Sequence, residues 1–277
     1  MQTSRVVLIT GGAGGIGTAI THALLREGHR IAAVDRNATA LARLHARFQA
    51  SDGERLLTVN ADLNAEDACL RAVEETIAHF GRIDAVINNA GIGMSSIRPD
   101  AETRHPSIEE LSADLWDNFF AINVRATLLI TRAAVPFMRE RKHGRVINNT
   151  TSFRTMLRVL PYGATKAAME SMSAVWAAEL APYGITVNVL IPGGPTDTPF
   201  IAAESGWPRD NMLKPEIMGP PACWLISDEA DGFTGQRLTA ARWNTGLPGA
   251  EAAREASRAI GWPELAADAV WLQPKSA

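Results

Sequence analysis

The chain has 277 residues, of which 46% are hydrophobic and 21% are charged, so it can form one large α/β domain or two small ones. Its formal net charge of −3 at pH 7 gives no basic surface, which argues against nucleic acid as a partner. Cys69 and Cys223 are too few for a disulfide framework, and neither a signal peptide nor an apolar run of about 18 residues is evident. We therefore expect a cytoplasmic protein with no membrane partner.

Short apolar runs rich in valine and isoleucine recur along the chain, without the polar alternation of half-exposed strands. They are residues 5–10, 30–35, 55–62, 84–91, 144–152 and 185–193. Strands that are buried on both faces have this pattern, and the stretches between them read as helices. The alternation predicts an α/β protein with a Rossmann-like, doubly wound parallel sheet in a three-layer α/β/α sandwich, residues 1–277 forming a single domain.

Three segments do not follow this alternation. Residues 92–112 form a long polar connection after the fourth strand, and residues 199–218 follow the sixth strand as a predicted substrate lid. Long irregular segments are often binding loops, and such sheets bind ligands at the carboxyl ends of their strands. Residues 240–277 form a C-terminal extension with Trp243, Trp262 and Trp271, which we expect to cover the substrate cleft or a subunit interface.

A glycine-rich turn, "TGGAGGIG" at residues 10–17, follows the first strand and opens a helix. Gly11, Gly15 and Gly17 are spaced for a sharp turn that lets a pyrophosphate approach the helix N-terminus. Asp35, 18 positions beyond Gly17 at the end of the second strand, suits a residue that accepts hydrogen bonds from ribose hydroxyls. Because a carboxylate there repels a 2′-phosphate, NAD is favoured over NADP, although the neighbouring Arg36 leaves NADP open.

Tyr162 and Lys166 lie four positions apart in a predicted helix, so they project from one face about one turn apart. A phenol with a pKa of about 10 is a poor acid–base catalyst at neutral pH, but a nearby ammonium favours the ionised form. We therefore expect Lys166 and an oxidised nicotinamide to lower the pKa of Tyr162 toward neutrality. The alternative is two independent residues on a surface helix.

Polar groups near this pair complete a candidate catalytic set. The fifth strand ends in the hydroxyls of Thr150, Thr151 and Ser152, one of which could hydrogen-bond a substrate carbonyl. Asn123 lies in an otherwise apolar helix, where a buried amide must find hydrogen-bond partners.

Taken together, the chain resembles the short-chain dehydrogenase/reductase family over roughly residues 5–200. The matching motifs, in the family's order, are "TGGAGGIG", Asp35, Asp62, "NNAG" (88–91), Asn123, "TTS" (150–152), "YGATK" (162–166) and "PGG" (192–194). The resemblance implies that Tyr162 is the acid–base, that Lys166 assists it and binds ribose, and that Asn123 holds a relay water. It places the cofactor against Gly11, Gly15, Ile16, Gly17, Asp35, Asp62, Leu63, Asn89, Gly91, Tyr162, Lys166, Pro192, Gly193 and Thr198.

Two positions depart from the family pattern. Thr151 lies eleven residues before Tyr162 and Ser152 lies ten, so either could be the hydroxyl that polarises the carbonyl. Successive strand residues point to opposite faces, and we favour Ser152 because a bend after the strand costs little. The turn "PGGPTDTPF" is also long, which leaves Thr196 or Thr198 to meet the cofactor, and we choose Thr198.

The predicted activity is the interconversion of a secondary alcohol and a ketone by an NAD(P)-dependent oxidoreductase. An enzyme acting on an imine or enone and a non-catalytic NAD(H) sensor are the alternatives. We expect an apolar substrate pocket with few polar anchors. Its candidate residues are Met94, Phe153, Met156, Leu157, Phe200, Trp207 and Met212, with Arg154 as a possible anchor for an acidic substrate. We predict no metal site, because His22, His105 and His143 lack ligand spacing, and we expect a homodimer or homotetramer, as is common among relatives.

Overall fold

The fold is built on one twisted sheet of eight strands. The computed structural model describes residues 3–269, and in them the strand order is β3-β2-β1-β4-β5-β6-β7-β8. All neighbouring strands are parallel except β7 and β8. The bounds are β1 Val6–Thr10, β2 Arg30–Asp35, β3 Leu56–Asn60, β4 Ala85–Asn88, β5 Gly144–Asn149, β6 Ile185–Ile191, β7 Gln236–Thr239 and β8 Ser257–Ala259.

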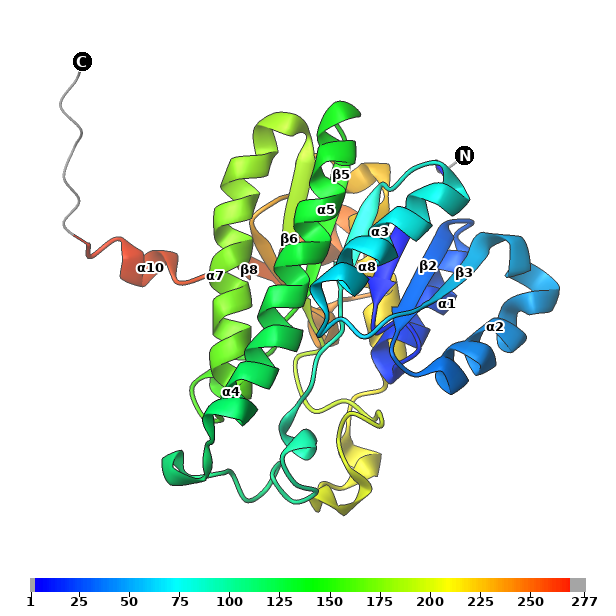
Figure 1. Cartoon of the computed structure of the whole chain (residues 1–277). Coiled ribbons are helices and arrows are strands. Elements are labelled where there is room, and N and C mark those ends of the chain that lie inside the picture. Colours follow the sequence, from blue (N-terminus) through cyan, green and yellow to red (C-terminus); the bar gives the residue numbers. More distant parts are fainter. Residues whose placement is uncertain (1–2, 270–277) are drawn as a thin grey trace.

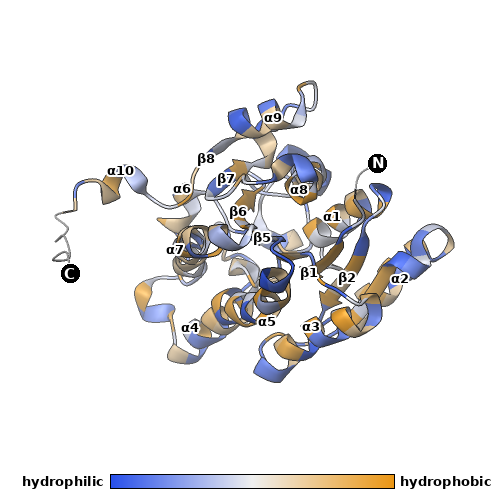
Figure 2. Cartoon of the chain, turned by 90° about the horizontal axis from the view of Figure 1, so that it is seen from above, coloured by the Kyte–Doolittle hydropathy of each residue, from blue (hydrophilic) through white to orange (hydrophobic). Residues whose placement is uncertain are grey.

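Helices cover both faces of the sheet, which gives three layers (Figures 1 and 2). Their bounds are α1 Gly15–Arg26, α2 Ala38–Asp52, α3 Glu66–Phe80, α4 Ala113–Phe120, α5 Ala126–Glu140, α6 Phe153–Met156, α7 Tyr162–Leu180, α8 Gly219–Ile226, α9 Gly249–Ala256 and α10 Pro263–Ala266. Local signals place their ends: the Asn37 side chain accepts a hydrogen bond from the Ala40 N–H at the start of α2, and α3 ends at Gly81 with φ of 76°.

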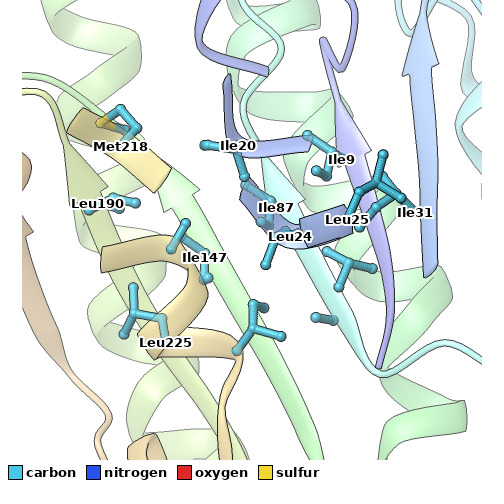
Figure 3. Close-up of a cluster of buried hydrophobic side chains, with 14 of the residues drawn as sticks. Ile9, Ile20, Leu24, Leu25, Ile31, Ile87, Ile147, Leu190, Met218 and Leu225 are labelled. Atoms are coloured by element: carbon cyan, nitrogen blue, oxygen red, sulfur yellow. The ribbon is translucent and has the colours of Figure 1, made fainter. Parts of the chain in front are cut away.

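Two apolar cores lie on opposite faces of the sheet. One packs side chains of α1, α2, α8 and α9 against the strands, and Figure 3 shows part of it, with Ile20 and Leu24 of α1 facing Ile9 and Ile87 of the sheet. The other packs α3, α5 and α7 against the opposite face. All five residues of β1 are buried, and so are all seven of β6, which explains why these strands read as unbroken apolar runs.

The predicted doubly wound sheet is confirmed, and the six predicted strands correspond to β1 to β6. β7 and β8 were not among the six predicted strands. They are short, and β8 has only one buried residue, so neither stands out as an apolar run. β8 joins antiparallel at the edge and carries the C-terminal extension onto the sheet.

The two predicted loop segments, 92–112 and 199–218, lie together beyond one end of the sheet (Figure 1). The N–H of Ala202 donates to Ser95 Oγ at 2.9 Å. A Cβ placed on Gly93 would come 2.3 Å from the ring of Phe200. These contacts make one wall from two segments that are about a hundred residues apart in the chain.

One continuous helical run is long and apolar. Within residues 3–269, Ala113–Glu140 could cross a membrane by length and composition alone, although, as expected, it holds no unbroken apolar run of about 18 residues. More than half of its most apolar stretch is buried in the fold, as is usual for the core helix of a soluble protein. The run joins α4, a π-helical turn at Ala121–Arg125 and α5.

The tryptophans of the C-terminal extension differ in their surroundings. Trp243 packs against Trp224 in the core, with ring centroids 6.0 Å apart. Trp262 lies beside Phe153 at 5.8 Å, where the chain leaves the sheet toward α10. Trp271 lies outside the described residues.

Candidate active site

The glycine turn between β1 and α1 is shaped by backbone contacts that allow no side chain. Gly11 has φ of 63°, and a Cβ on Gly17 would come 2.0 Å from the Gly11 carbonyl oxygen. No side chain caps the first turn of α1, so its N–H groups are available to an anion. Asn89 holds the turn from the neighbouring strand, because its Nδ2 donates to the carbonyls of Thr10 and Gly11, both at 3.1 Å.

The segment after β6 reaches back to this turn. A Cβ on Gly15 would lie 2.4 Å from Thr198 Cγ2, so Thr198 packs directly on the N-terminus of α1. Gly193, with φ of 104°, reverses the chain where β6 ends. Thr196 forms an isolated bridge with Leu213 but borders the same cavity as Thr198. Both candidate threonines thus border the cavity, and Thr198 is the one that packs against the glycine turn.

Asp35 stands at the carboxyl end of β2, beside the glycine turn. Its carboxylate accepts from the N–H of Ala13 at 3.3 Å and from the N–H of Asn37 at 3.0 Å. Asp62 follows β3, where its Oδ1 accepts from the Asn64 N–H at 3.0 Å. Two carboxylates thus border one end of a cavity whose other end reaches α7.

That cavity, of about 1030 Å³, brings most of the predicted site together. The predicted residues that line it are Gly11, Gly15, Ile16, Asp35, Asp62, Leu63, Asn89, Gly91, Ser152, Tyr162, Lys166, Pro192, Gly193 and Thr198. Gly17 and Asn123 do not line it: Gly17 packs beneath the turn, and Asn123 is fully buried behind the wall. The space is large and runs from the glycine turn to Tyr162, as an extended dinucleotide and a small substrate would require.

Asn123 lies in the π-helical turn, an irregularity often found at functional sites. Its Oδ1 accepts from the Ile92 N–H at 2.8 Å, and its Nδ2 donates to the Ile92 carbonyl at 3.1 Å and to Thr165 Oγ1 at 3.0 Å. The amide therefore joins the loop after β4 to the first turn of α7. Lys166 Nζ is a near neighbour across Gly91, on which a Cβ would lie 3.0 Å from Asn123 Oδ1 and 3.7 Å from Lys166 Nζ.

Tyr162 and Lys166 share one face of α7, as predicted, but the pKa of Tyr162 is not shifted in the expected direction. The Lys166 side chain is 3% exposed, its Nζ donates to the Asn149 carbonyl at 2.8 Å, and it lies 5.7 Å from the Tyr162 ring centroid. Burial lowers the pKa of Lys166 from 10.5 to about 8. Burial, and then the Glu102 carboxylate, raise the pKa of Tyr162 well above 10, and only the Thr151 hydroxyl opposes them. The predicted fall in the pKa of Tyr162 is therefore wrong for the protein alone.

The two candidate hydroxyls have different surroundings. Ser152 caps α6: its Oγ accepts from the Thr155 N–H at 3.1 Å and pairs with Thr155 Oγ1 at 2.9 Å. Thr151 lies close enough to Tyr162 for its hydroxyl to lower the pKa of the phenol by hydrogen bonding. The serine hydroxyl is therefore engaged in the helix cap, whereas the threonine hydroxyl lies beside the phenol.

Comparison with known proteins decides the family. The profile described as "short chain dehydrogenase" matches residues 5–208. The chain belongs to the short-chain dehydrogenase/reductase family. Acetoacetyl-CoA reductase of Acinetobacter is 30% identical over 259 residues, which cover 86% of this chain and 97% of the relative. The 3beta-hydroxysteroid dehydrogenase 2 of Eggerthella lenta is 30% identical over 250 residues, 85% of this chain and 92% of that one.

Solved structures of other family members agree with the fold. The 3-ketoacyl-(acyl-carrier-protein) reductase of Brucella melitensis, complexed with NADH, has a TM-score of 0.71 at 28% identity, covering 83% of this chain and 93% of that one. Levodione reductase has a TM-score of 0.74 at 26% identity, covering 91% and 99%. The short-chain dehydrogenase/reductase described here is thus an oxidoreductase of a family that binds NAD(H) or NADP(H).

Three charged or titratable residues that line the cavity of this short-chain dehydrogenase/reductase were not singled out from its sequence. Glu102 and His105 come from the 92–112 loop, and Arg158 comes from the turn after α6. Of the predicted substrate residues, Met94, Phe200 and Trp207 line the cavity, as does Arg154, whereas Phe153, Met156, Leu157 and Met212 do not. Loop residues carry no periodic signal, so only the fold brings them to the cavity.

Proposed function

We propose that this protein interconverts a secondary alcohol and a ketone with NAD(H), using Tyr162 as the acid–base. The observation that carries the proposal is one continuous cavity with the glycine turn and Asp35 at one end and Tyr162, Thr151 and Lys166 at the other. The bare helix N-terminus and the glycines that leave no room for Cβ atoms fit the pyrophosphate of a dinucleotide. When bound, the cofactor supplies or accepts the hydride.

The side chains supply the proton and hold the substrate oxygen. Tyr162, protonated at neutral pH because its pKa is raised, donates its proton to the oxygen of a ketone during reduction. The hydroxyl of Thr151, beside that of Tyr162, donates a hydrogen bond to the same oxygen. Lys166 places a cation behind the phenol, and Asn123 fixes the position of α7 against the loop after β4.

Two neighbouring substitutions separate the roles of the hydroxyls. Thr151→Val keeps the side-chain shape but removes the proposed hydrogen bond, so kcat should fall by about 10²- to 10³-fold. Ser152→Ala should leave kcat within about twofold and cost up to about 1 kcal/mol of stability through the lost cap. Steady-state kinetics and thermal unfolding of both variants test this. The reverse pattern would assign the role to Ser152.

The choice of NAD over NADP is assigned to Asp35. Asp35 borders the cavity beside the glycine turn, where we expect the adenosine ribose to bind, so a 2′-phosphate would bring a second negative charge to it. Like charges in contact disfavour binding by several kcal/mol. Asp35→Ala should therefore lower the preference for NAD over NADP, measured as the ratio of kcat/KM values, by at least about tenfold. Arg36→Ala, which removes the adjacent charge, should leave the use of NAD unchanged. A wild-type protein that already prefers NADP would contradict this assignment.

The substrate end of the cavity is apolar with charged groups at its border. Met94, Phe200 and Trp207 provide the apolar lining, and Arg154 and Arg158 border it without an ion pair to any residue within 3–269. We expect a mainly apolar ketone that carries an anionic group. Two kinds of anionic ketone should be screened by NADH absorbance beside their neutral analogues. One carries a carboxylate, and the other is a thioester of a phosphate-bearing thiol. Absence of NADH oxidation across all ketones would contradict the proposed reaction.

We also propose a cytoplasmic homodimer or homotetramer. Large apolar side chains are exposed on the helices of one outer layer: Leu128 and Phe137 on α5 and Val175 on α7. Arg139 and Glu179 link the two helices through an ion pair at 2.9 Å. A shared face of this kind would be covered in an oligomer.

A further inference from the structure

A buried ion pair lies one helical turn beyond Lys166 and takes no direct part in the proposed reaction. Glu170 of α7 is 0% exposed and Arg237 of β7 is 6% exposed, with Nη1 of the arginine 3.0 Å from Oε2 of the glutamate. A buried pair is weak evidence for stability, because desolvation of the two charges offsets their attraction. The pair therefore calls for another role.

Both partners also hydrogen-bond to the residues that follow β5, one of which, Thr151, carries the proposed catalytic hydroxyl. Arg237 Nη1 donates to Thr150 Oγ1 at 3.1 Å, and that hydroxyl donates to Glu170 Oε2 at 3.1 Å. Arg237 Nη2 donates to the carbonyl oxygen of Thr151. The guanidinium thus holds the main chain of the residue whose hydroxyl meets Tyr162.

The same ion pair also contacts α6 and the C-terminal extension. The guanidinium carbon of Arg237 lies 4.3 Å from the centroid of the Phe153 ring, the first residue of α6. Glu170 Oε1 accepts from the Gly261 N–H at 3.3 Å, and the next residue, Trp262, packs beside Phe153. Figure 2 shows α6, α7, β7 and β8 gathered at this end of the sheet. One ion pair therefore connects the C-terminal extension to the wall of the cavity.

We propose that Glu170 and Arg237 are positioning residues that fix Thr151 and the cavity wall of residues 152–159 relative to Tyr162. The proposal rests on the proposed function, in which Thr151 and Tyr162 meet the same substrate oxygen. A guanidinium is suited to this task because its planar fork donates in several fixed directions at once. The guanidinium of Arg237 donates to Glu170, Thr150 and Thr151 at the same time. A lysine ammonium on a flexible stem does not reproduce this set of hydrogen bonds.

The test compares variants that keep or delete the pair. Arg237→Lys retains the charge without the fork, and the double variant Glu170→Met with Arg237→Met removes both charges, so that neither is left buried alone. Arg145→Met is the matched control: Arg145 is 2% exposed and binds Asp231 and the Ser227 carbonyl, but it lies in β5 at the end far from Thr151. Circular dichroism first establishes that each variant is folded at the assay temperature.

We expect kcat for ketone reduction to fall by about 10- to 100-fold in Arg237→Lys and in the double variant, since small misplacements of reacting groups have effects of this size. The KM for NADH should stay within about twofold, and Arg145→Met should keep its kcat. Wild-type kcat in Arg237→Lys or in the double variant, or an equal loss in Arg145→Met, would overturn the proposal.

Amide hydrogen exchange gives a readout that does not depend on turnover. The N–H groups of Thr155, Met156 and Val159 are hydrogen-bonded within the wall, and we expect them to exchange faster in Arg237→Lys than in wild type. Unchanged exchange across residues 150–159 would overturn the positioning role even if the reaction stands. A wild-type protein without NADH-linked turnover would instead overturn the proposed function, whatever the exchange shows.

Discussion

Tyr162→Phe is expected to lower turnover by several orders of magnitude while leaving NADH binding intact. The substitution removes one oxygen from a side chain that lines the cavity, and it leaves the ring that packs near Phe200, at 5.9 Å between centroids. A positioned general acid–base contributes about 10²- to 10⁴-fold, so kcat in both directions should fall by this factor. The dissociation constant for NADH should change by less than about threefold, because the glycine turn and Asp35 are untouched.

Cofactor fluorescence titration and steady-state kinetics measure the two quantities separately. Tyr183→Phe is the matched control, since Tyr183 is the only other tyrosine in the sequence and is exposed at the end of α7, where it faces Arg139. Its kinetics should equal those of wild type. Normal turnover in Tyr162→Phe would remove the phenol from the mechanism and favour a reaction that needs no proton donor there.

The raised pKa of Tyr162 also gives the two directions different pH dependences. A protonated phenol donates a proton, so ketone reduction should proceed at neutral pH and decline only as the phenol ionises. Alcohol oxidation needs the ionised form, so its rate should rise with pH across the neutral and alkaline range. Glu102 disfavours the phenolate through its negative charge.

Lys166→Met is expected to lose turnover without losing stability at neutral pH. The substitution removes the cation from behind Tyr162, and we expect kcat to fall at least about 100-fold. It also removes a buried ammonium whose only oxygen partner within residues 3–269 is the Asn149 carbonyl. Loss of that hydrogen bond costs stability, while relief from burying a charge restores it.

The sign of the pH effect on stability follows from the pKa of Lys166. The value is about 8 in the folded protein and 10.5 without burial, so between these pH values the unfolded chain binds more protons. Raising the pH through this window therefore increases the contribution of Lys166 to the stability of wild type. The full shift corresponds to about 3 kcal/mol of pH-dependent stability, which Lys166→Met lacks.

Urea unfolding of wild type and Lys166→Met at pH 7.5 and pH 10.5 measures this difference directly. Contributions of all other titrating groups cancel when the two proteins are subtracted at each pH. The difference in free energy of unfolding should shift in favour of wild type by about 3 kcal/mol as the pH rises. A difference that does not change with pH would show that Lys166 titrates normally and is not desolvated.

The sheet and most of the cofactor end of the site could be predicted from the sequence. Strands buried on both faces form unbroken apolar runs, and the glycine turn and Asp35 keep a fixed spacing along one βαβ unit, as in 10–17 and 30–35. These features depend on local sequence. β7 and β8 were outside the prediction because they are mostly polar and have only two buried residues and one, whereas the equally short β4 is buried throughout.

The substrate end could not be predicted as well, because it depends on contacts between distant segments. Thr151 and Ser152 are equivalent as sequence, and they differ only because a helix of four residues begins after Ser152 and engages its hydroxyl. The pKa of Tyr162 depends on its burial and then on Glu102, which is sixty positions away in a loop. Residue spacing showed that Lys166 shares a helix face with Tyr162, but not that its ammonium turns to the Asn149 carbonyl.

The central claim is that Tyr162 exchanges a proton at the end of a dinucleotide cavity, and its ionisation can be measured directly. In the Tyr183→Phe variant Tyr162 is the sole tyrosine, so phenolate absorbance near 295 nm reports its pKa alone. We expect a pKa above 10 in the free protein and a value lowered toward neutrality by saturating NAD⁺, because a positive charge beside the phenol favours its ionised form. A pKa that is the same with and without NAD⁺ would contradict the account.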